Sequence, residues 1–328
     1  MKGKLYDPGP LQGLLGRHGL YTNKGLGQHF LVSGPVVEKI SEAANGCRGI
    51  CEIGPGPGVL TQPLSLQAER LIALELDPRM PALLAESAPR AEVRVQDALQ
   101  IDLGAVLDEL PTPRAIVSNM PYYITGPLLQ RIADVRGKID CAVLMMQREV
   151  ANRVVASAGD GERGSLSVYL QTLFTIRALV QVPASAFLPP PKVDSTVLVF
   201  TPRVGEPGAD YFRLVRLGFT QPRKTLANNL ANGYKISRDE LIPHLEEIGL
   251  HEKVRGAGAY GRGLAGVGFS SDAALRSRQK KKAATSNATV ERPSIMNDAV
   301  ETTAPLRCPG LSGSGESPNT MPKWTGTS

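Results

Sequence analysis

Short apolar segments alternate with longer amphipathic segments between about residue 49 and residue 201. The apolar segments are rich in Val, Ile and Leu, as buried strands are, and the segments between them have apolar residues at helical spacing. This alternation is typical of a doubly wound α/β domain, in which helices cover both faces of a mostly parallel sheet. The predicted strands cover residues 49–53, 70–75, 92–95, 114–118, 139–146, 176–182 and 195–201. The predicted helices of this region cover residues 59–68, 78–87, 126–133 and 147–157.

Helical patterns also flank the predicted sheet. Ser33 and Pro35 are typical of a helix start, and the helix is expected to run through Ala44. A stretch rich in Pro and Gly at residues 201–208 ends the α/β domain, and a small all-helical domain is predicted after it, with helices at 211–219, 223–232 and 238–248. The sequence thus divides into an arm (1–32), an α/β domain (33–203), a helical domain (204–256) and a tail (257–328).

Composition excludes several classes of protein. The 328 residues are 42% apolar and 21% charged, which is ordinary for a globular protein. No apolar run approaches the roughly 20 residues that cross a bilayer. No apolar segment typical of a secretory signal follows Lys2 and Lys4, the first charged residues. We therefore expect a soluble, cytoplasmic protein. The four cysteines and four histidines lack metal-ligand spacing, so no metal site is expected. A net charge of +6 permits RNA binding without arguing for it.

The first candidate site is a glycine-rich turn, Glu52-Ile-Gly-Pro-Gly-Pro-Gly58, between a predicted strand and a predicted helix. Glycines at 54, 56 and 58 let a ligand approach the backbone beside a helix N-terminus. A nicotinamide-binding GxGxxG would need glycine where Val59 stands, which disfavours a dehydrogenase. The acidic form of the turn is similar to the first motif of class I S-adenosylmethionine (SAM) methyltransferases.

Two carboxylates follow the next two strands. Glu75 ends the second strand, where a carboxylate can accept both hydroxyls of a ribose, and Asp97 follows the third, where it can accept an adenine amino group. Open α/β sheets bind ligands along this carboxyl edge. Three ligand-type positions at three successive strand ends therefore predict a nucleoside-containing cofactor.

The fourth strand ends in Asn119-Met-Pro-Tyr122-Tyr-Ile-Thr125, the sharpest signal in the chain. It is similar to the Asn-Pro-Pro-Tyr motif of enzymes that methylate exocyclic amino groups. The Asn119 carbonyl and the next backbone carbonyl can accept the two N–H groups of an adenine amine, which aims its lone pair at the methyl donor. Pro121 holds the turn, and Tyr122 offers a face on which an extruded base can stack.

Several motifs in a fixed order make a more specific resemblance. They are Gly25–Leu31, Glu52–Gly58, Glu75-Leu-Asp77, Asp97-Ala98, Asn119–Thr125, Gln147–Val150 and Phe187–Ser195. Together, over about residues 17 to 255, they resemble the small-subunit (16S) ribosomal RNA adenine N6,N6-dimethyltransferase family. The resemblance implies a Rossmann-like class I fold, SAM as cofactor, and dimethylation of two adjacent adenosines in the 3′-terminal hairpin of 16S rRNA within the assembling small subunit. A monomer is expected.

The resemblance also implies roles for individual residues. The cofactor-site residues would be His29, Leu31, Glu52, Gly54, Gly56, Gly58, Glu75, Asp97 and Asn119. The residues at the target base would be Asn119, Pro121, Tyr122 and Phe187, with the base held between Tyr122 and Phe187. Arg223 and Lys224, expected at a helix start, would contact the RNA backbone.

The chain departs from the family pattern in three places. His29 and Tyr123 stand where the family commonly has Asn. After Arg255 a further amphipathic helix is expected, but the sequence is rich in glycine and then too poor in apolar residues to fold. If the reading frame of the codons for residues 258–269 is shifted by one nucleotide, permissible codons encode an amphipathic helix of this kind. We therefore hypothesise a frameshift near residue 256 and a disordered tail.

Two other functions use the same motifs. One is methylation of adenine in large-subunit rRNA or in DNA, against which the motifs at 147–150 and 187–195 and the helical domain argue. The other is a non-catalytic RNA-binding assembly or transcription factor, which would have no need of a carboxylate such as Glu75 to accept ribose hydroxyls.

Overall fold

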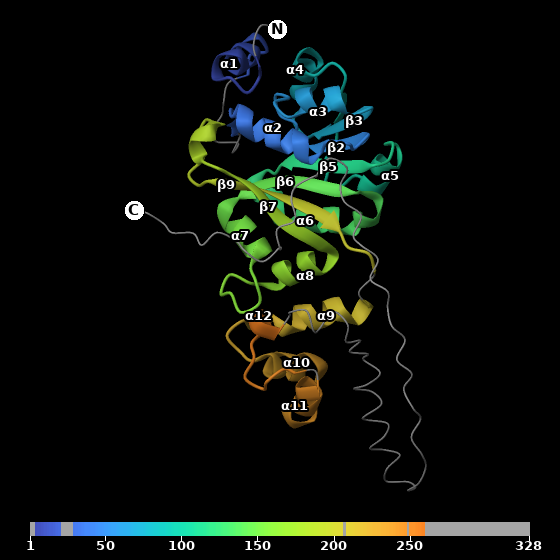
Figure 1. The fold of residues 1–328 in the computed structure, drawn as a ribbon, viewed down its shortest axis with the longest axis vertical. Coiled ribbons are helices and arrows are strands. Elements are labelled where there is room, and N and C mark those ends of the chain that lie inside the picture. Colours follow the sequence, from blue (N-terminus) through green and yellow to red (C-terminus); the bar gives the residue numbers. More distant parts are fainter. Residues whose placement is uncertain (1–3, 21–28, 206–207, 248, 260–328) are drawn as a thin grey trace.

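A seven-stranded sheet organises the larger domain of the computed structural model, which describes residues 4–20, 29–205, 208–247 and 249–259 (Figure 1). Its strands are β2 (Gly49–Ile53), β3 (Arg70–Glu75), β4 (Glu92–Val95), β5 (Arg114–Asn119), β6 (Cys141–Gln147), β7 (Phe174–Val182) and β9 (Ser195–Pro202). A separate two-stranded ladder joins β1 (Phe30–Leu31) to β8 (Phe187–Leu188).

The strand order in the sheet is β4-β3-β2-β5-β6-β9-β7. Strands β2 to β6 pair in parallel, and β9 and β7 pair antiparallel at the other end. The order reverses between β2 and β5, so the loops that follow these two strands diverge and leave a crevice at the carboxyl edge. This is the α/β architecture that the sequence predicts.

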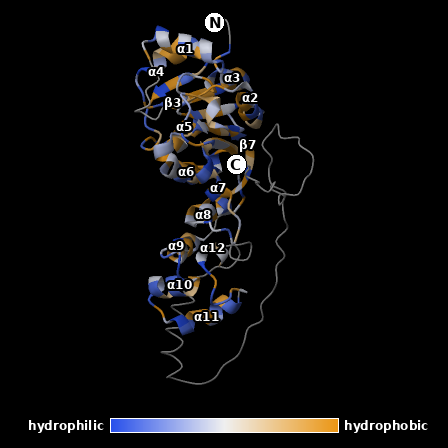
Figure 2. Cartoon of the chain, turned by 90° about the vertical axis from the view of Figure 1, so that its left-hand side faces the viewer, coloured by the Kyte–Doolittle hydropathy of each residue, from blue (hydrophilic) through white to orange (hydrophobic). Residues whose placement is uncertain are grey.

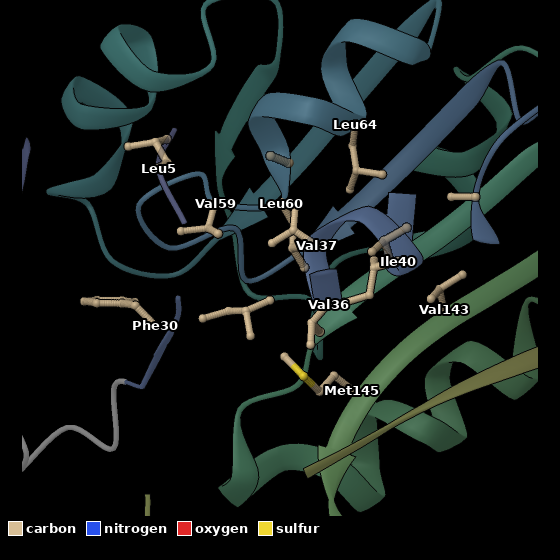
Figure 3. Close-up of a cluster of buried hydrophobic side chains, with 14 of the residues drawn as sticks. Leu5, Phe30, Val36, Val37, Ile40, Val59, Leu60, Leu64, Val143 and Met145 are labelled. Carbon is tan, nitrogen blue, oxygen red and sulfur yellow. The ribbon is translucent and has the colours of Figure 1, made fainter. Parts of the chain in front are cut away.

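Helices cover both faces of the sheet, as predicted. The helices are α1 (Pro8–Arg17), α2 (Gly34–Ala43), α3 (Thr61–Gln67), α4 (Met80–Ser87), α5 (Leu103–Asp108), α6 (Thr125–Asp134), α7 (Arg148–Val155) and α8 (Ser165–Leu173). Neighbouring residues of a strand place their side chains on opposite faces of the sheet, in two separate cores. Val117 and Val143 pack with α2 and α3 on one face, whereas Ile116 and Leu144 pack with α5 and α6 on the other. Figure 3 shows the first core, where Met145 lies near Val36 and Val143 near Ile40, both residues of α2.

The smaller domain contains α9 (Ala209–Gly218), α10 (Leu226–Tyr234), α11 (Arg238–Glu247) and α12 (Gly256–Ala259), stacked beyond α8 (Figure 1). Apolar residues alternate with polar ones along these helices (Figure 2), and the apolar ones form a third core. Buried Asn229 donates hydrogen bonds from Nδ2 to the carbonyls of Gly218 and Gln221, at 2.8 and 3.0 Å. This amide therefore fixes the turn between α9 and α10.

Some elements differ from the sequence prediction. Helix α10 begins at Leu226, capped by Thr225, whose hydroxyl accepts from the Asn228 N–H at 3.3 Å. Arg223 and Lys224 consequently lie in the turn before the helix and not at its start. Helices α1, α5 and α8 are not predicted: α5 has only six residues, whereas α1 and α8 have apolar residues at helical spacing that the sequence prediction does not assign to a helix. The predicted disordered tail begins at residue 257, but residues 257–259 belong to helix α12, so the prediction is wrong there. The rest of the tail, with its predicted frameshift, lies outside the described residues.

Within the described part of the chain, no helix is long and apolar enough to cross a membrane.

Candidate active site at the carboxyl edge of the sheet

A cavity of about 380 Å³ opens where the strand order reverses. Its walls come from residues 29–31 at β1, the glycine-rich turn after β2, residues 75–80 at the end of β3 and residues 119–123 at the end of β5. Its volume lies in the range of small-molecule and cofactor sites. Four segments far apart in the sequence therefore meet at one pocket.

The glycine-rich turn needs residues without a side chain. Gly54, Gly56 and Gly58 have φ values of +72°, +53° and +90°, which side chains rarely allow. A Cβ on Gly56 would also contact the Phe30 ring at 3.4 Å. Gly54 and Gly56 line the cavity, so a ligand can approach their backbone.

Gly58 differs from the other two glycines. It is buried and is not among the cavity-lining residues. A Cβ there would lie 2.5 Å from Ser87 Oγ, on α4. The structure therefore gives Gly58 a packing role, close approach of the turn to α4, in place of the predicted contact with a cofactor.

Glu75 organises the loops around the cavity. Its Oε2 accepts a hydrogen bond from the Gly56 N–H at 3.0 Å, and its Oε1 accepts from the N–H groups of Leu76 and Asp77 at 2.8 and 2.9 Å. Burial raises the pKa of Glu75, an effect that these backbone bonds partly oppose. A carboxylate offers about four acceptor positions. Three are occupied by the backbone, which leaves room for a further hydroxyl donor.

Glu52 is the most deeply buried acid of the cavity, with a side chain 1% exposed. Its Oε2 has no hydrogen-bond partner among the described residues. Burial raises the pKa of Glu52 to about 8; the neighbouring Thr61 hydroxyl opposes this rise, and the nearby Glu75 carboxylate contributes to it. A buried acceptor without a partner is a position at which a bound ligand can complete the hydrogen bonding.

The turn after β5 places Asn119 at the rim of the cavity. Ser118 fixes the strand end, because its buried hydroxyl donates to the carbonyl of Ile53 at 2.7 Å. Asn119, Pro121 and Tyr122 all line the cavity, as the sequence predicts. Pro121 also packs near Gly54, 3.9 Å from where a Cβ would stand, so the β5 turn and the glycine-rich turn are neighbours.

His29 and Leu31 also line the cavity, as predicted. The His29 ring stacks on Tyr122, with centroids 5.9 Å apart and planes inclined by 26°. Its Nδ1 lies 2.8 Å from the Pro189 carbonyl, to which it must donate because a carbonyl only accepts. The arm thus closes one side of the pocket.

Asp97 and Phe187, like Gly58, are predicted site residues that lie outside this lining. Asp97 follows β4, where its Oδ1 accepts from the Leu99 N–H at 2.9 Å and its Oδ2 from Gln100 Nε2 at 2.8 Å. Phe187, predicted to face the cleft, is 2% exposed and packs in the core instead. Its place opposite Leu31 in the β1–β8 ladder turns it inward.

The cavity includes residues that sequence reasoning missed. Leu76 and Tyr123 are 58% and 72% exposed although both are large and apolar or aromatic. Arg79 also lines the cavity and forms an ion pair with Asp77 at 2.5 Å. Leu76 directly follows the acidic strand end, a position that could have been found from the motif alone.

Comparison with known proteins identifies the family. A family profile described as "Ribosomal RNA adenine dimethylase" matches residues 19–256. The chain belongs to the ribosomal RNA adenine dimethylase family. The match confirms the predicted resemblance, and the protein is therefore a SAM-dependent rRNA methyltransferase with a class I fold.

Individual relatives agree with this assignment. A protein named ribosomal RNA small subunit methyltransferase A from Geobacillus thermodenitrificans is 37% identical over 265 residues, covering 76% of this chain and 90% of that protein. The protein of the same name from Shouchella clausii is 36% identical, covering 76% and 89%.

Two solved structures share the fold. A dimethyladenosine transferase from Plasmodium falciparum is 27% identical with a TM-score of 0.59, covering 70% of this chain and 92% of that one. The 23S rRNA methyltransferase ErmE is 27% identical with a TM-score of 0.57, covering 72% and 96%.

The cavity fits the cofactor of this family. Its glycine-rich turn leaves backbone exposed, Glu75 retains acceptor capacity toward a hydroxyl, and Glu52 offers a buried oxygen that lacks a partner. Among the residues that the structure describes, no group of three or more acidic, His or Cys side chains is placed to hold a metal ion.

Proposed function

We propose that this enzyme dimethylates the N6 amino groups of two adjacent adenosines in the 3′-terminal hairpin of 16S rRNA, within the assembling small subunit. The observation that carries the proposal is the meeting of the Asn119–Tyr122 turn with the glycine-rich turn at one cavity. The choice of the small subunit is supported by relatives at 36–37% identity that are named for it.

The cofactor would be held along the carboxyl edge of the sheet. The backbone of Gly54 and Gly56 would accommodate its close approach, and Glu75 would accept a ribose hydroxyl. Because three acceptor positions of Glu75 are already in use, a second hydroxyl would displace one backbone donor. Asp97 would reach the adenine amino group from the end of the neighbouring β4.

The bound SAM supplies a cationic methyl group, so the protein's task is to position the acceptor amine. Asn119 ends β5 at the cavity rim, and no hydrogen bond of its side chain to a described residue competes for its carbonyl oxygen. That oxygen would accept one N–H of the amine, and the next backbone carbonyl would accept the other. Positioning of this kind supplies much of the rate enhancement when the donor is already reactive.

RNA would approach over the mouth of the cavity. Tyr122 would stack on the extruded base, and the exposed Arg223 and Lys224 would contact backbone phosphates. A small-subunit substrate would put the enzyme in the cytoplasm, where bacterial subunits assemble.

The test is to incubate the protein with labelled SAM and small subunits that lack the modification, and then to map the label. We expect label on two adjacent adenosines near the 3′ end of 16S rRNA and none on large subunits. Label on large-subunit rRNA would favour a specificity like that in the name of ErmE. Binding of SAM without transfer would instead indicate a non-catalytic RNA-binding factor.

A further inference from the structure

Tyr123 leaves an aromatic ring in water at the mouth of the cavity. It is 72% exposed and it lines the cavity together with Tyr122. Every other Phe or Tyr that the structure describes is buried or half-buried. A tyrosine combines a large apolar face with a polar edge, which is why this residue is enriched where a protein binds a partner. The one exposed ring among the described residues therefore lies beside the site where the substrate enters.

The two consecutive tyrosines differ in what holds them. The Tyr122 ring stacks on His29, and its hydroxyl lies 3.4 Å from the Ser195 hydroxyl. The Tyr123 side chain forms no hydrogen bond or ring contact with a residue that the structure describes. Both belong to the short 3-10 helix η2 (Tyr122–Ile124), in which successive side chains are turned by about 120° from one another. The Tyr123 ring consequently points away from the Tyr122 ring, and its faces are free.

The connection that holds Tyr122 also carries positive charge. Lys192, three residues before Ser195, is exposed and forms no ion pair within the described part of the chain. Asp194, the carboxylate of the same connection, is neutralised by Arg148, at 2.9 Å. A free ammonium group and a free aromatic face at one cavity mouth are the two features with which proteins bind single-stranded nucleic acid.

We propose that the Tyr123 ring stacks on the base next to the target adenosine, outside the cavity, so that Tyr123 is a further substrate-binding residue. This rests on the proposed function, in which the target adenine enters the cavity beside Asn119 and Tyr122. The neighbouring nucleotide is joined to the target through one phosphate, so its base stays at the mouth. Because the proposed targets are two adjacent adenosines, the stacked base is the second target while the first is methylated.

Two variants of Tyr123 separate the aromatic face from the hydroxyl. Tyr123→Phe keeps the face, whereas Tyr123→Ala removes it. The matched control is Leu66→Ala, because Leu66 is 64% exposed, lies on α3 and does not line the cavity. Each protein is to be assayed for affinity toward undermodified small subunits and, with the enzyme alone, for SAM affinity. Thermal unfolding checks that each variant folds, which is expected because exposed side chains contribute little to stability.

Tyr123→Ala should bind the subunits about 5- to 150-fold more weakly, the loss of one base–aromatic stack. Tyr123→Phe and Leu66→Ala should match the wild type, and SAM affinity should be the same in all four proteins. Replacing either target adenosine by uridine, which offers a smaller face, should weaken binding by the wild type and not by Tyr123→Ala, because each change removes the same contact.

Three results would overturn the inference: wild-type subunit affinity in Tyr123→Ala, an equal loss in Tyr123→Phe, or a fall in SAM affinity when the ring is removed. Equal effects of the uridine replacements on the wild type and on Tyr123→Ala would also overturn it. Failure of the wild-type enzyme to methylate small subunits would instead refute the proposed function.

Discussion

Replacing Glu52 by Gln should change how the stability of this protein depends on pH. Glu52 is 1% exposed, and burial raises the pKa of its carboxyl group from an ordinary 4.5 to about 8. Between these values the folded protein holds a proton on Glu52 that the unfolded chain releases. Its contribution to stability is therefore fully present below about pH 4.5 and is lost as the pH rises through about 8.

The size of the effect follows from the pKa difference. Each unit corresponds to about 1.4 kcal/mol, so the wild-type free energy of unfolding should fall by at most about 5 kcal/mol between pH 4.5 and pH 8. Glutamine is neutral throughout, so Glu52→Gln should lack this decline and become the more stable form at about pH 8. Burial also raises the pKa of Glu75, so the free energy of unfolding should still fall with pH in both proteins, with a smaller slope in Glu52→Gln.

Urea denaturation at several pH values between about 5 and 9 measures this difference. Glu69→Gln is the matched control, because Glu69 is exposed and its hydrogen bonds with Arg48 lower the pKa of its carboxyl group. The control should leave the wild-type slope between pH 5 and 8 unchanged. Parallel stability curves for the wild type and Glu52→Gln would show that Glu52 is not held protonated by burial.

Three further predictions concern catalysis, packing and RNA binding. Asn119→Ala should lower the single-turnover rate by at least about 100-fold and leave SAM affinity near the wild-type value, because it removes only an acceptor for the amine. Rapid-quench methylation measures the rate, and equilibrium binding measures the SAM affinity. A near-normal rate would exclude this role of Asn119. Gly58→Ala should destabilise the fold by about 2 kcal/mol or more in urea denaturation, because φ at Gly58 is +90° and a Cβ there would lie 2.5 Å from a side chain of α4. The control is Gly126→Ala, which should be neutral or slightly stabilising because the space around Gly126 is open. Equal effects of the two glycine substitutions would contradict this packing account. Arg223→Ala with Lys224→Ala should reduce the slope of log RNA affinity against log salt by about 1 per charge, and an unchanged slope in a salt titration would remove them from the RNA interface.

Much of the fold could be predicted because most strands are short, nearly continuous apolar runs. Strands β2, β3 and β4 occur at the predicted residues, although β4 alternates charged and apolar residues. The short helix α5 escaped prediction because it has six residues and is held by packing against the sheet and not by its own periodicity. The pairing of β1 with β8 could not be predicted for a different reason: strands of two residues that are distant in sequence leave no local pattern of apolar residues.

The candidate site could be predicted where a residue's position follows from the strand that ends beside it. Glu75 and Asn119 directly end parallel strands, so the sheet itself brings them to one edge. Phe187 could not be placed in this way. Its orientation depends on the ladder with β1, and the sequence does not show which face of a two-residue strand turns inward. The stacking of His29 on Tyr122 depends on the same ladder.

The central claim is that the donor binds along the carboxyl edge of the sheet, beside Asn119. A crystal structure of the protein with S-adenosylhomocysteine tests it most directly. We predict that the ligand occupies the cavity with its ribose at Glu75 and its sulfur facing Asn119. Finding the ligand elsewhere, or finding this cavity filled by the protein's own side chains at saturating ligand, would contradict the account.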